Sequence, residues 1–176
     1  MSSIAIENTQ PMMERWTVDP QRTTVEFEVN HFWGLHTVHG RFDRFEGSYT
    51  VGPAGPQIDL AIDAASVDTG NAARDKHLRA EDYFDVAEYP QMRFSSTRVR
   101  PTGIGRVQVS GTLSAAGASV PVDFEATVRL VDGELEVEAT TTVDQSQFGM
   151  ISGPLWNVRR PVKLHVKARV VPEPPA

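Results

Sequence analysis

Apolar and polar residues alternate one by one along most of the chain. In each such segment the apolar positions stand two residues apart, and the positions between them are mostly polar or charged. Successive side chains of a β-strand point to opposite faces, so this period of two predicts strands with one buried and one wetted face. Antiparallel sheets contain such strands, whereas parallel sheets are buried on both faces. The alternating segments are residues 25–30, 58–63, 107–113, 120–130, 134–143 and 162–170.

The connections between these segments have the composition of hairpin turns. Asp132-Gly133 joins two alternating segments directly, and this dipeptide favours a type I′ turn. Other breaks fall at residues 53–56, 102–103 and 116–117. Together the segments amount to about eight strands. A sheet of that size loses its exposed edges when it closes, so we predict an all-β fold: an extended antiparallel barrel.

One stretch, residues 68–80, departs from the alternation. Asn71 is a good helix cap, and the alanines and leucine that follow it favour a helix. Asp75 and Arg79 stand four residues apart, a spacing that favours an ion pair on a helix. We therefore expect one short helix inserted between strands. Outside the alternating region, residues 1–13 are expected to form a flexible arm and residues 172–176 a loose tail, which leaves one barrel domain at 14–171.

Composition and charge narrow the classes of partner. The chain has 176 residues, of which 40% are hydrophobic and 23% charged, as in ordinary folded domains. Its 17 basic against 23 acidic residues give a net charge of −6. That balance argues against nucleic acid as a partner and disfavours overall attraction to an anionic membrane, although it leaves room for a local basic patch.

Two further features concern redox chemistry and location. The chain has no cysteine, which excludes disulfides, thiolate zinc sites and iron–sulfur clusters. Its first residues lack the basic and apolar regions of an export signal, and no apolar run approaches the ~18 residues of a membrane-spanning helix. We therefore expect a cytoplasmic protein.

No familiar catalytic or metal motif is present. The sequence lacks a GxSxG elbow, a GxxxxGK[ST] loop and an HExxH helix. His31, His36 and His39 lie close in sequence, but the ends of a strand over these residues would be ~26 Å apart. A bend near Trp33 would bring His31 to His36 without supplying a third ligand. We interpret these histidines as a polar loop at the barrel rim and predict no metal site.

The predicted helix carries the remaining candidates for polar chemistry, namely Arg74, Asp75 and His77. They could hold an anionic or quinone head group at the mouth of the barrel, or they could form a set of salt bridges on the helix surface. An alternative function is an enzyme acting on a hydrophobic, isoprenoid-like substrate, with His77 as general acid or base and Asp75 orienting it.

Several motifs occur in order along almost the whole predicted domain. They include WTVDP at 16–20, IDAASVDTGN at 62–71, RDKHLR at 74–79, DYFD at 82–85 and DQSQFGM at 144–150. In combination they resemble the YceI-like family. The resemblance implies a lipocalin-like barrel that binds a long polyisoprenoid, such as an isoprenoid quinone or a prenyl phosphate, in an internal tunnel. It also implies a carrier or reservoir without catalytic residues, and without a cofactor other than the bound lipid.

A ligand of this kind suggests a role for the apolar and aromatic positions, although periodicity does not distinguish a filled barrel from a hollow one. The head group is expected near Arg74, Asp75 and His77, or near His31 and Trp33 at the rim. Transient membrane contact, and a homodimer that covers an apolar mouth, are further expectations. The remaining expected ligand contacts are Phe27, Phe42, Leu60, Ile62, Phe84, Phe94, Phe124, Phe148 and Trp156.

Overall fold

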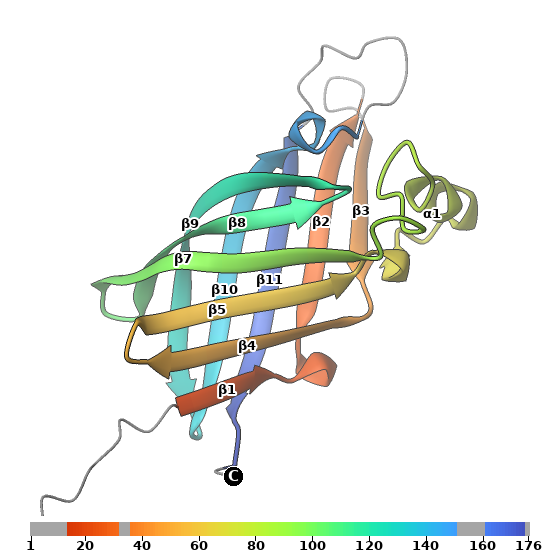
Figure 1. The fold of residues 1–176 in the computed structure, drawn as a ribbon. Coiled ribbons are helices and arrows are strands. Elements are labelled where there is room, and N and C mark those ends of the chain that lie inside the picture. The colour runs from red at the N-terminus through yellow and green to blue at the C-terminus, as the bar shows by residue number, and fades with distance from the viewer. Residues whose placement is uncertain (1–13, 32–35, 151–160, 175–176) are drawn as a thin grey trace, which may run out of the picture.

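The chain folds into an antiparallel β-barrel that closes on itself (Figure 1). The computed structural model describes residues 14–31, 36–150 and 161–174. Eight strands form the closed ring, because β1 pairs with both β4 and β11. This confirms the predicted all-β class and the barrel. In ring order the strands are β1 (Glu14–Val18), β4 (Phe45–Gly52), β5 (Gly55–Asp63), β7 (Gln91–Gly103), β8 (Arg106–Ala115), β9 (Ala118–Val131), β10 (Glu134–Asp144) and β11 (Pro161–Pro172).

Among the described residues, three additional strands extend the ring at one end. They are β2 (Thr24–His31), β3 (His36–Phe42) and β6 (Val67–Asp68). The two ends of β11 have different neighbours, since Val170 pairs with Val18 of β1 whereas Val162 pairs with Val29 of β2. The barrel is therefore longer on this side, where β2 and β3 continue it (Figure 1).

The alternating pattern correctly identified the inner face of the strands. In β2, for example, Val25, Phe27 and Val29 are buried while Glu26 is exposed. Leu130 is an exception, because it continues the apolar set of β9 but is 70% exposed. The pairing of β9 with β8 ends at Thr127, so Leu130 lies on the part of β9 that extends past β8.

The turns and the helix also follow the sequence. Asp132 and Gly133 have φ angles of 54° and 78°, the left-handed values that a type I′ turn requires at both central positions. The helix α1 (Ala72–Leu78) begins after Asn71, whose side chain accepts a hydrogen bond from the amide of Arg74. The described part of the chain also contains three 3₁₀ helices: η1 (Pro20–Arg22), η3 (Ala64–Ser66) and η4 (Gln145–Phe148).

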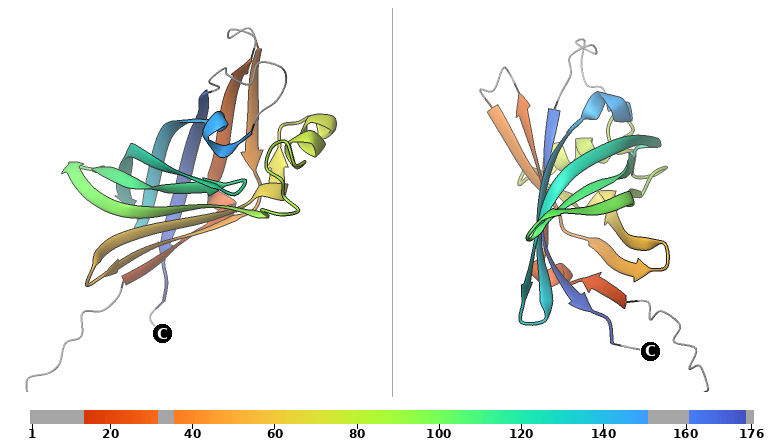
Figure 2. Two further views of the ribbon diagram at one scale, coloured as in Figure 1. Left: turned by 45° about the horizontal axis from the view of Figure 1, so that its top comes forward. Right: turned by 90° about the vertical axis from the view of Figure 1, so that its left-hand side faces the viewer.

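The predicted pair between Asp75 and Arg79 is wrong. The Arg79 guanidinium donates instead to the backbone oxygens of Ala65 and Val67, at 2.8 and 2.9 Å. These carbonyls belong to η3 and β6, so Arg79 ties the helix to the barrel wall. In the part of the chain that the structure describes, no helix is long and apolar enough to cross a membrane. The helix α1 lies on one side of the barrel, and the β7–β8 connection projects from the opposite side (Figures 1 and 2).

Candidate ligand-binding site

A cavity of about 760 Å³ occupies the interior of the barrel. Every strand of the closed ring contributes residues to its lining. On β10 the lining takes every second residue from Leu135 to Val143. These residues span ~26 Å at ~3.3 Å per residue, so the cavity is elongated. The interior, which the sequence left open as filled or hollow, is hollow.

Small side chains on one wall explain why the barrel is not filled. The lining residues of β9, β10 and β11 are mostly valine and alanine, with Thr141 among them. Ala126 of β9 stands directly opposite Ala139 of β10 in the strand register. A barrel of about eight strands encloses either packed side chains or a small ligand. Alanines in the middle of a wall project too little to fill that space.

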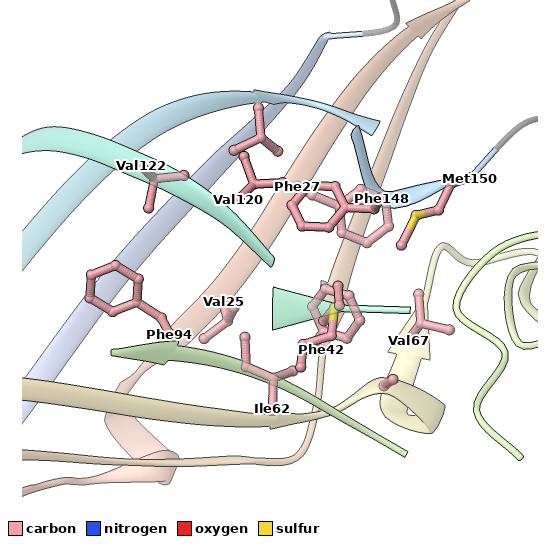
Figure 3. Packing of buried hydrophobic residues seen from close by; sticks show 14 of the residues in the cluster. Val25, Phe27, Phe42, Ile62, Val67, Phe94, Val120, Val122, Phe148 and Met150 are labelled. Carbon is pink, nitrogen blue, oxygen red and sulfur yellow. The ribbon is translucent and has the colours of Figure 1, made fainter. Parts of the chain in front are cut away.

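Five of the phenylalanines that line the cavity form two groups. The rings of Phe27 and Phe42 have centroids 5.5 Å apart, and that of Phe84 lies 5.7 Å from Phe42. The second group is Phe94 and Phe124, with centroids 5.6 Å apart. Figure 3 shows Phe27, Phe42 and Phe94 among the buried residues of the interior. All five line the cavity, so each presents apolar surface to a ligand.

Two glycines provide the space in which these rings lie. A Cβ atom built on Gly40 would lie 2.2 Å from Cζ of Phe27, its direct partner across the β2–β3 pair. A Cβ atom built on Gly111 would lie 2.5 Å from Cε2 of Phe94. Ordinary carbon contacts are ~3.5–4.0 Å, so any side chain at either glycine would displace the ring. The rings therefore pack against strand backbone.

Polar residues gather where α1 meets the cavity. Arg74 and His77 of α1 line it together with Tyr83. The Arg74 guanidinium donates to the side-chain and backbone oxygens of Thr69, at 2.8 and 2.9 Å. The ring of His77 stands nearly perpendicular to that of Tyr83, with centroids 5.0 Å apart. This end of the cavity thus offers a cation and an imidazole beside an aromatic wall.

Asp75 does not belong to this lining. Its carboxylate is buried and accepts hydrogen bonds from the backbone amide and the hydroxyl of Thr69. The Nε2 atom of His77 instead lies 3.9 Å from a carboxylate oxygen of Asp82, and both side chains are more than half exposed. Asp75 therefore holds the loop before α1, and the expectation that it orients His77 is wrong.

The other expected ligand contacts divide into two sets. Trp33 and Trp156 fall outside the described residues, and for His31 the structure describes only the backbone, which lies opposite His36 in the β2–β3 pair. Contact of any of these residues with a ligand stays a prediction. The expected residues that line the cavity are Phe27, Phe42, Leu60, Ile62, Arg74, His77, Phe84, Phe94, Phe124 and Phe148.

The cavity also has lining residues that were not among the expected ligand contacts. Trp16, Tyr49 and Met150 contribute apolar surface, and Gln145 contributes a buried amide. Burial raises the pKa of the Tyr49 phenol above its ordinary value, as an apolar environment does. Trp16 and Tyr49 each stand two residues from an apolar position of their own short strand, and this alternation could have identified them.

The site has no obvious metal-binding chemistry in its described part. Among residues 14–31, 36–150 and 161–174, no group of three or more histidines and carboxylates lies together as metal ligands do. The polar groups at the cavity are instead scattered around an apolar lining. The arrangement is suited to burying a long apolar molecule with one polar end.

Known proteins resemble this chain in sequence and in fold. A UPF0312 protein of Pseudomonas putida (strain GB-1) is 34% identical over 159 residues, which cover 82% of this chain and 80% of the relative. The crystal structure of Burkholderia cenocepacia BcnA superposes with a TM-score of 0.75 at 23% identity, covering 88% of this chain and 99% of that one. A polyisoprenoid binding domain from Saccharophagus degradans has a TM-score of 0.67 at 21% identity, covering 87% and 97%.

The family model described as a YceI-like domain matches residues 16–170, which include all but the outermost residues of the barrel. The resemblance inferred from the motifs is thus confirmed by the sequence match, and the hollow barrel agrees with it in fold. The chain belongs to the YceI-like family.

Proposed function

We propose that the protein binds and carries, or stores, a long-chain polyisoprenoid lipid without transforming it. The observation that supports this function is the elongated apolar cavity inside the barrel. A domain of the same fold is described as binding polyisoprenoids. Isoprenoid quinones and prenyl phosphates are the ligand classes that we favour, because both join a long apolar tail to one polar end.

The size of the cavity suggests the length of tail that fits. A group the size of a water molecule takes ~30 Å³ of liquid, so 760 Å³ has room for about 25 such groups, or about five isoprene units. Each buried CH₂ contributes ~0.8 kcal/mol, so about twenty buried carbons contribute ~16 kcal/mol. Association costs ~4–15 kcal/mol. A tail of four or five units therefore provides net binding without polar recognition.

We place the head group near Arg74 and His77. An arginine and an imidazole can donate hydrogen bonds to a phosphate or to the carbonyl oxygens of a quinone. Two of the Arg74 nitrogens already donate to Thr69, which fixes the guanidinium in position. The anchored side chain loses less conformational entropy on binding than a free one.

Catalysis is the second candidate function, with His77 as acid or base. The structure gives it little support, because the His77 side chain is 59% exposed and its nearby carboxylate, Asp82, is 65% exposed. Acid–base groups tuned for catalysis are usually shielded from water. Turnover of a prenyl compound with a pH dependence that Asp82→Asn alters would favour the enzyme over the carrier.

The carrier proposal is tested by blocking the cavity. Ala139→Trp adds a large ring to the middle of the inner wall, and Thr140→Trp adds the same ring to the exposed face of the same strand. We expect purified protein to yield an isoprenoid on solvent extraction and mass spectrometry, and delipidated protein to bind geranylgeraniol. Ala139→Trp should abolish binding while the protein stays folded, and Thr140→Trp should keep it. Unchanged binding by Ala139→Trp would refute a ligand in the cavity.

The head-group position is tested separately. Arg74→Ala combined with His77→Ala should weaken binding of geranylgeranyl phosphate about 10- to 100-fold more than binding of geranylgeraniol, because a charged hydrogen bond is worth ~1.5–3 kcal/mol. Lys76→Ala removes a cation from the exposed face of the same helix and should affect both ligands little. Equal losses for the two ligands in the double variant would mean that Arg74 and His77 only stabilise the fold.

A further inference from the structure

The connection between β7 and β8 combines basic and apolar residues at one exposed tip. Residues 98–106, here called the β7–β8 tip, contain three arginines and no Asp or Glu, in a chain with a net charge of −6. Ile104 is fully exposed, at 105% of its reference area. A single exposed isoleucine is ordinary on a protein surface. Its position between arginines on a projecting hairpin is what sets it apart (Figures 1 and 2).

The charges of this tip are compensated only in part. Arg98 and Arg100 have no ion-pair partner among the described residues, whereas Arg106 pairs with a carboxylate oxygen of Glu125 at 4.0 Å. Another oxygen of Glu125 accepts a hydrogen bond from the Thr102 hydroxyl, at 3.3 Å. Other arginines of the barrel, such as Arg22, make close ion pairs. At physiological ionic strength charges are screened over ~8 Å, so acidic residues farther than this from Arg98 and Arg100 hardly weaken the positive field around them.

The tip is continuous with the ligand cavity. Val99 of β7 and Val107 of β8 both line the cavity, and both stand within five residues of Ile104. The side of the barrel from which the tip projects is opposite α1, where Arg74 and His77 lie (Figures 1 and 2). A surface that engages the tip would therefore stand next to the end of the cavity that lacks these polar residues.

We propose that the β7–β8 tip docks the protein on the surface of an anionic lipid bilayer. Ile104 enters the interface between head groups and acyl chains, and Arg98 and Arg100 contact lipid phosphates. An apolar tip flanked by basic residues is complementary to such a surface, in which anionic head groups lie above apolar acyl chains. Docking goes beyond the proposed carrier function and needs no isoprenoid, so the two can be tested apart.

Cosedimentation of the full chain with vesicles that contain no isoprenoid tests the docking. We expect binding to phosphatidylcholine vesicles that contain phosphatidylglycerol, weak binding to phosphatidylcholine alone, and weakening at high salt. Arg100→Gln should bind about five-fold more weakly and Ile104→Ser about ten-fold more weakly. The control is Arg93→Gln, which removes an equal charge from an exposed position near the α1 end of β7 and should change binding less than two-fold.

Three results would overturn the docking proposal. The first is failure of the unmodified protein to bind anionic vesicles. The second is equal binding to neutral and anionic vesicles, and the third is an equal loss in Arg93→Gln and Arg100→Gln, which would reflect overall charge alone. If the tip variants instead abolish self-association or the capture of another protein, while vesicle binding is absent, the tip serves a protein interface. Each of these results leaves the geranylgeraniol assay, and hence the carrier proposal, unaffected.

Discussion

Replacement of Gly40 by alanine is expected to disturb both stability and the shape of the cavity. The added Cβ would lie 2.2, 2.5 and 2.9 Å from three carbons of the Phe27 ring. Because carbon contacts optimally at ~3.5–4.0 Å, the ring must move by at least ~1.3 Å. Phe27 is only 8% exposed and contacts Phe42, so the available space for this movement is the cavity itself.

The size of the stability change in Gly40→Ala follows from two opposing effects. Overpacking of a well-ordered core costs ~1–3 kcal/mol. Replacing glycine by alanine also restricts the unfolded chain, which stabilises the fold by ~0.4–1 kcal/mol. The net expectation is a destabilisation of ~0–2.6 kcal/mol, centred at ~1.3 kcal/mol. For a domain of this size 1 kcal/mol lowers Tm by ~2–4 °C.

Urea unfolding and geranylgeraniol binding measure the two consequences of this substitution. Gly103→Ala is the control, because its added Cβ would meet only the flexible Arg106 guanidinium, at 3.3 Å. Combining Gly40→Ala with Phe27→Leu should relieve the strain, with a coupling energy of ~0.5–3 kcal/mol. If Gly40→Ala changes stability and binding as little as Gly103→Ala does, or if the double variant shows no coupling, Gly40 does not provide the space for the Phe27 ring.

Three shorter predictions concern the rest of the fold. Asp75→Ala should lower the free energy of unfolding in urea by ~1–3 kcal/mol, because it removes the buried carboxylate oxygen that accepts both hydrogen bonds from Thr69. Hydrogen bonds from Arg22 hold the pKa of Asp19 and of Glu134 below their ordinary values of 3.8 and 4.5. Their contribution to stability should therefore be present at neutral pH and lost as the pH falls below these values. When the free energy of unfolding in urea is measured at a series of pH values, Arg22→Gln should reduce its dependence on pH in this acidic range. Far-ultraviolet circular dichroism should show a β-dominated spectrum, and a helix content near half would contradict the barrel.

The sequence predicted the parts of the fold that depend on local pattern. Alternation identified which face of each long strand is buried, because that pattern repeats over many residues. The cap at Asn71 located the start of α1 for the same reason, since capping depends on neighbours in sequence. The Asp75–Arg79 pair failed because each side chain found a better partner elsewhere, Thr69 for the aspartate and the carbonyl of Val67 for the arginine. Backbone carbonyls brought close by folding leave no trace in a residue pattern.

The volume of the interior was harder to predict than its polarity. Period two shows that Ala126 and Ala139 face inward but does not show that they face each other. That pairing depends on strand register, which the turn between β9 and β10 fixes. The same holds for Gly40, which accommodates Phe27 only because the β2–β3 register places them opposite one another. A count of small inward-facing residues would have favoured a hollow barrel. The length of the cavity could not be predicted in this way, because it depends on how all the strands pair.

The two ends of the cavity differ in chemistry. If the protein takes up its lipid from a bilayer on which the β7–β8 tip docks, this difference favours one class of head group over another. A lipid that enters beside the β7–β8 tip must carry its head group through the apolar interior of the barrel before it reaches Arg74 and His77 at the α1 side. An ionised phosphate pays a large desolvation cost on that path, whereas a neutral quinone loses only hydrogen bonds with water. Uptake from vesicles should therefore be faster for an isoprenoid quinone than for a prenyl phosphate of equal tail length, even where the phosphate binds more tightly once inside. Stopped-flow uptake of the two ligands tests this, and equal rates would mean that the lipid enters beside α1 with its head group already next to Arg74.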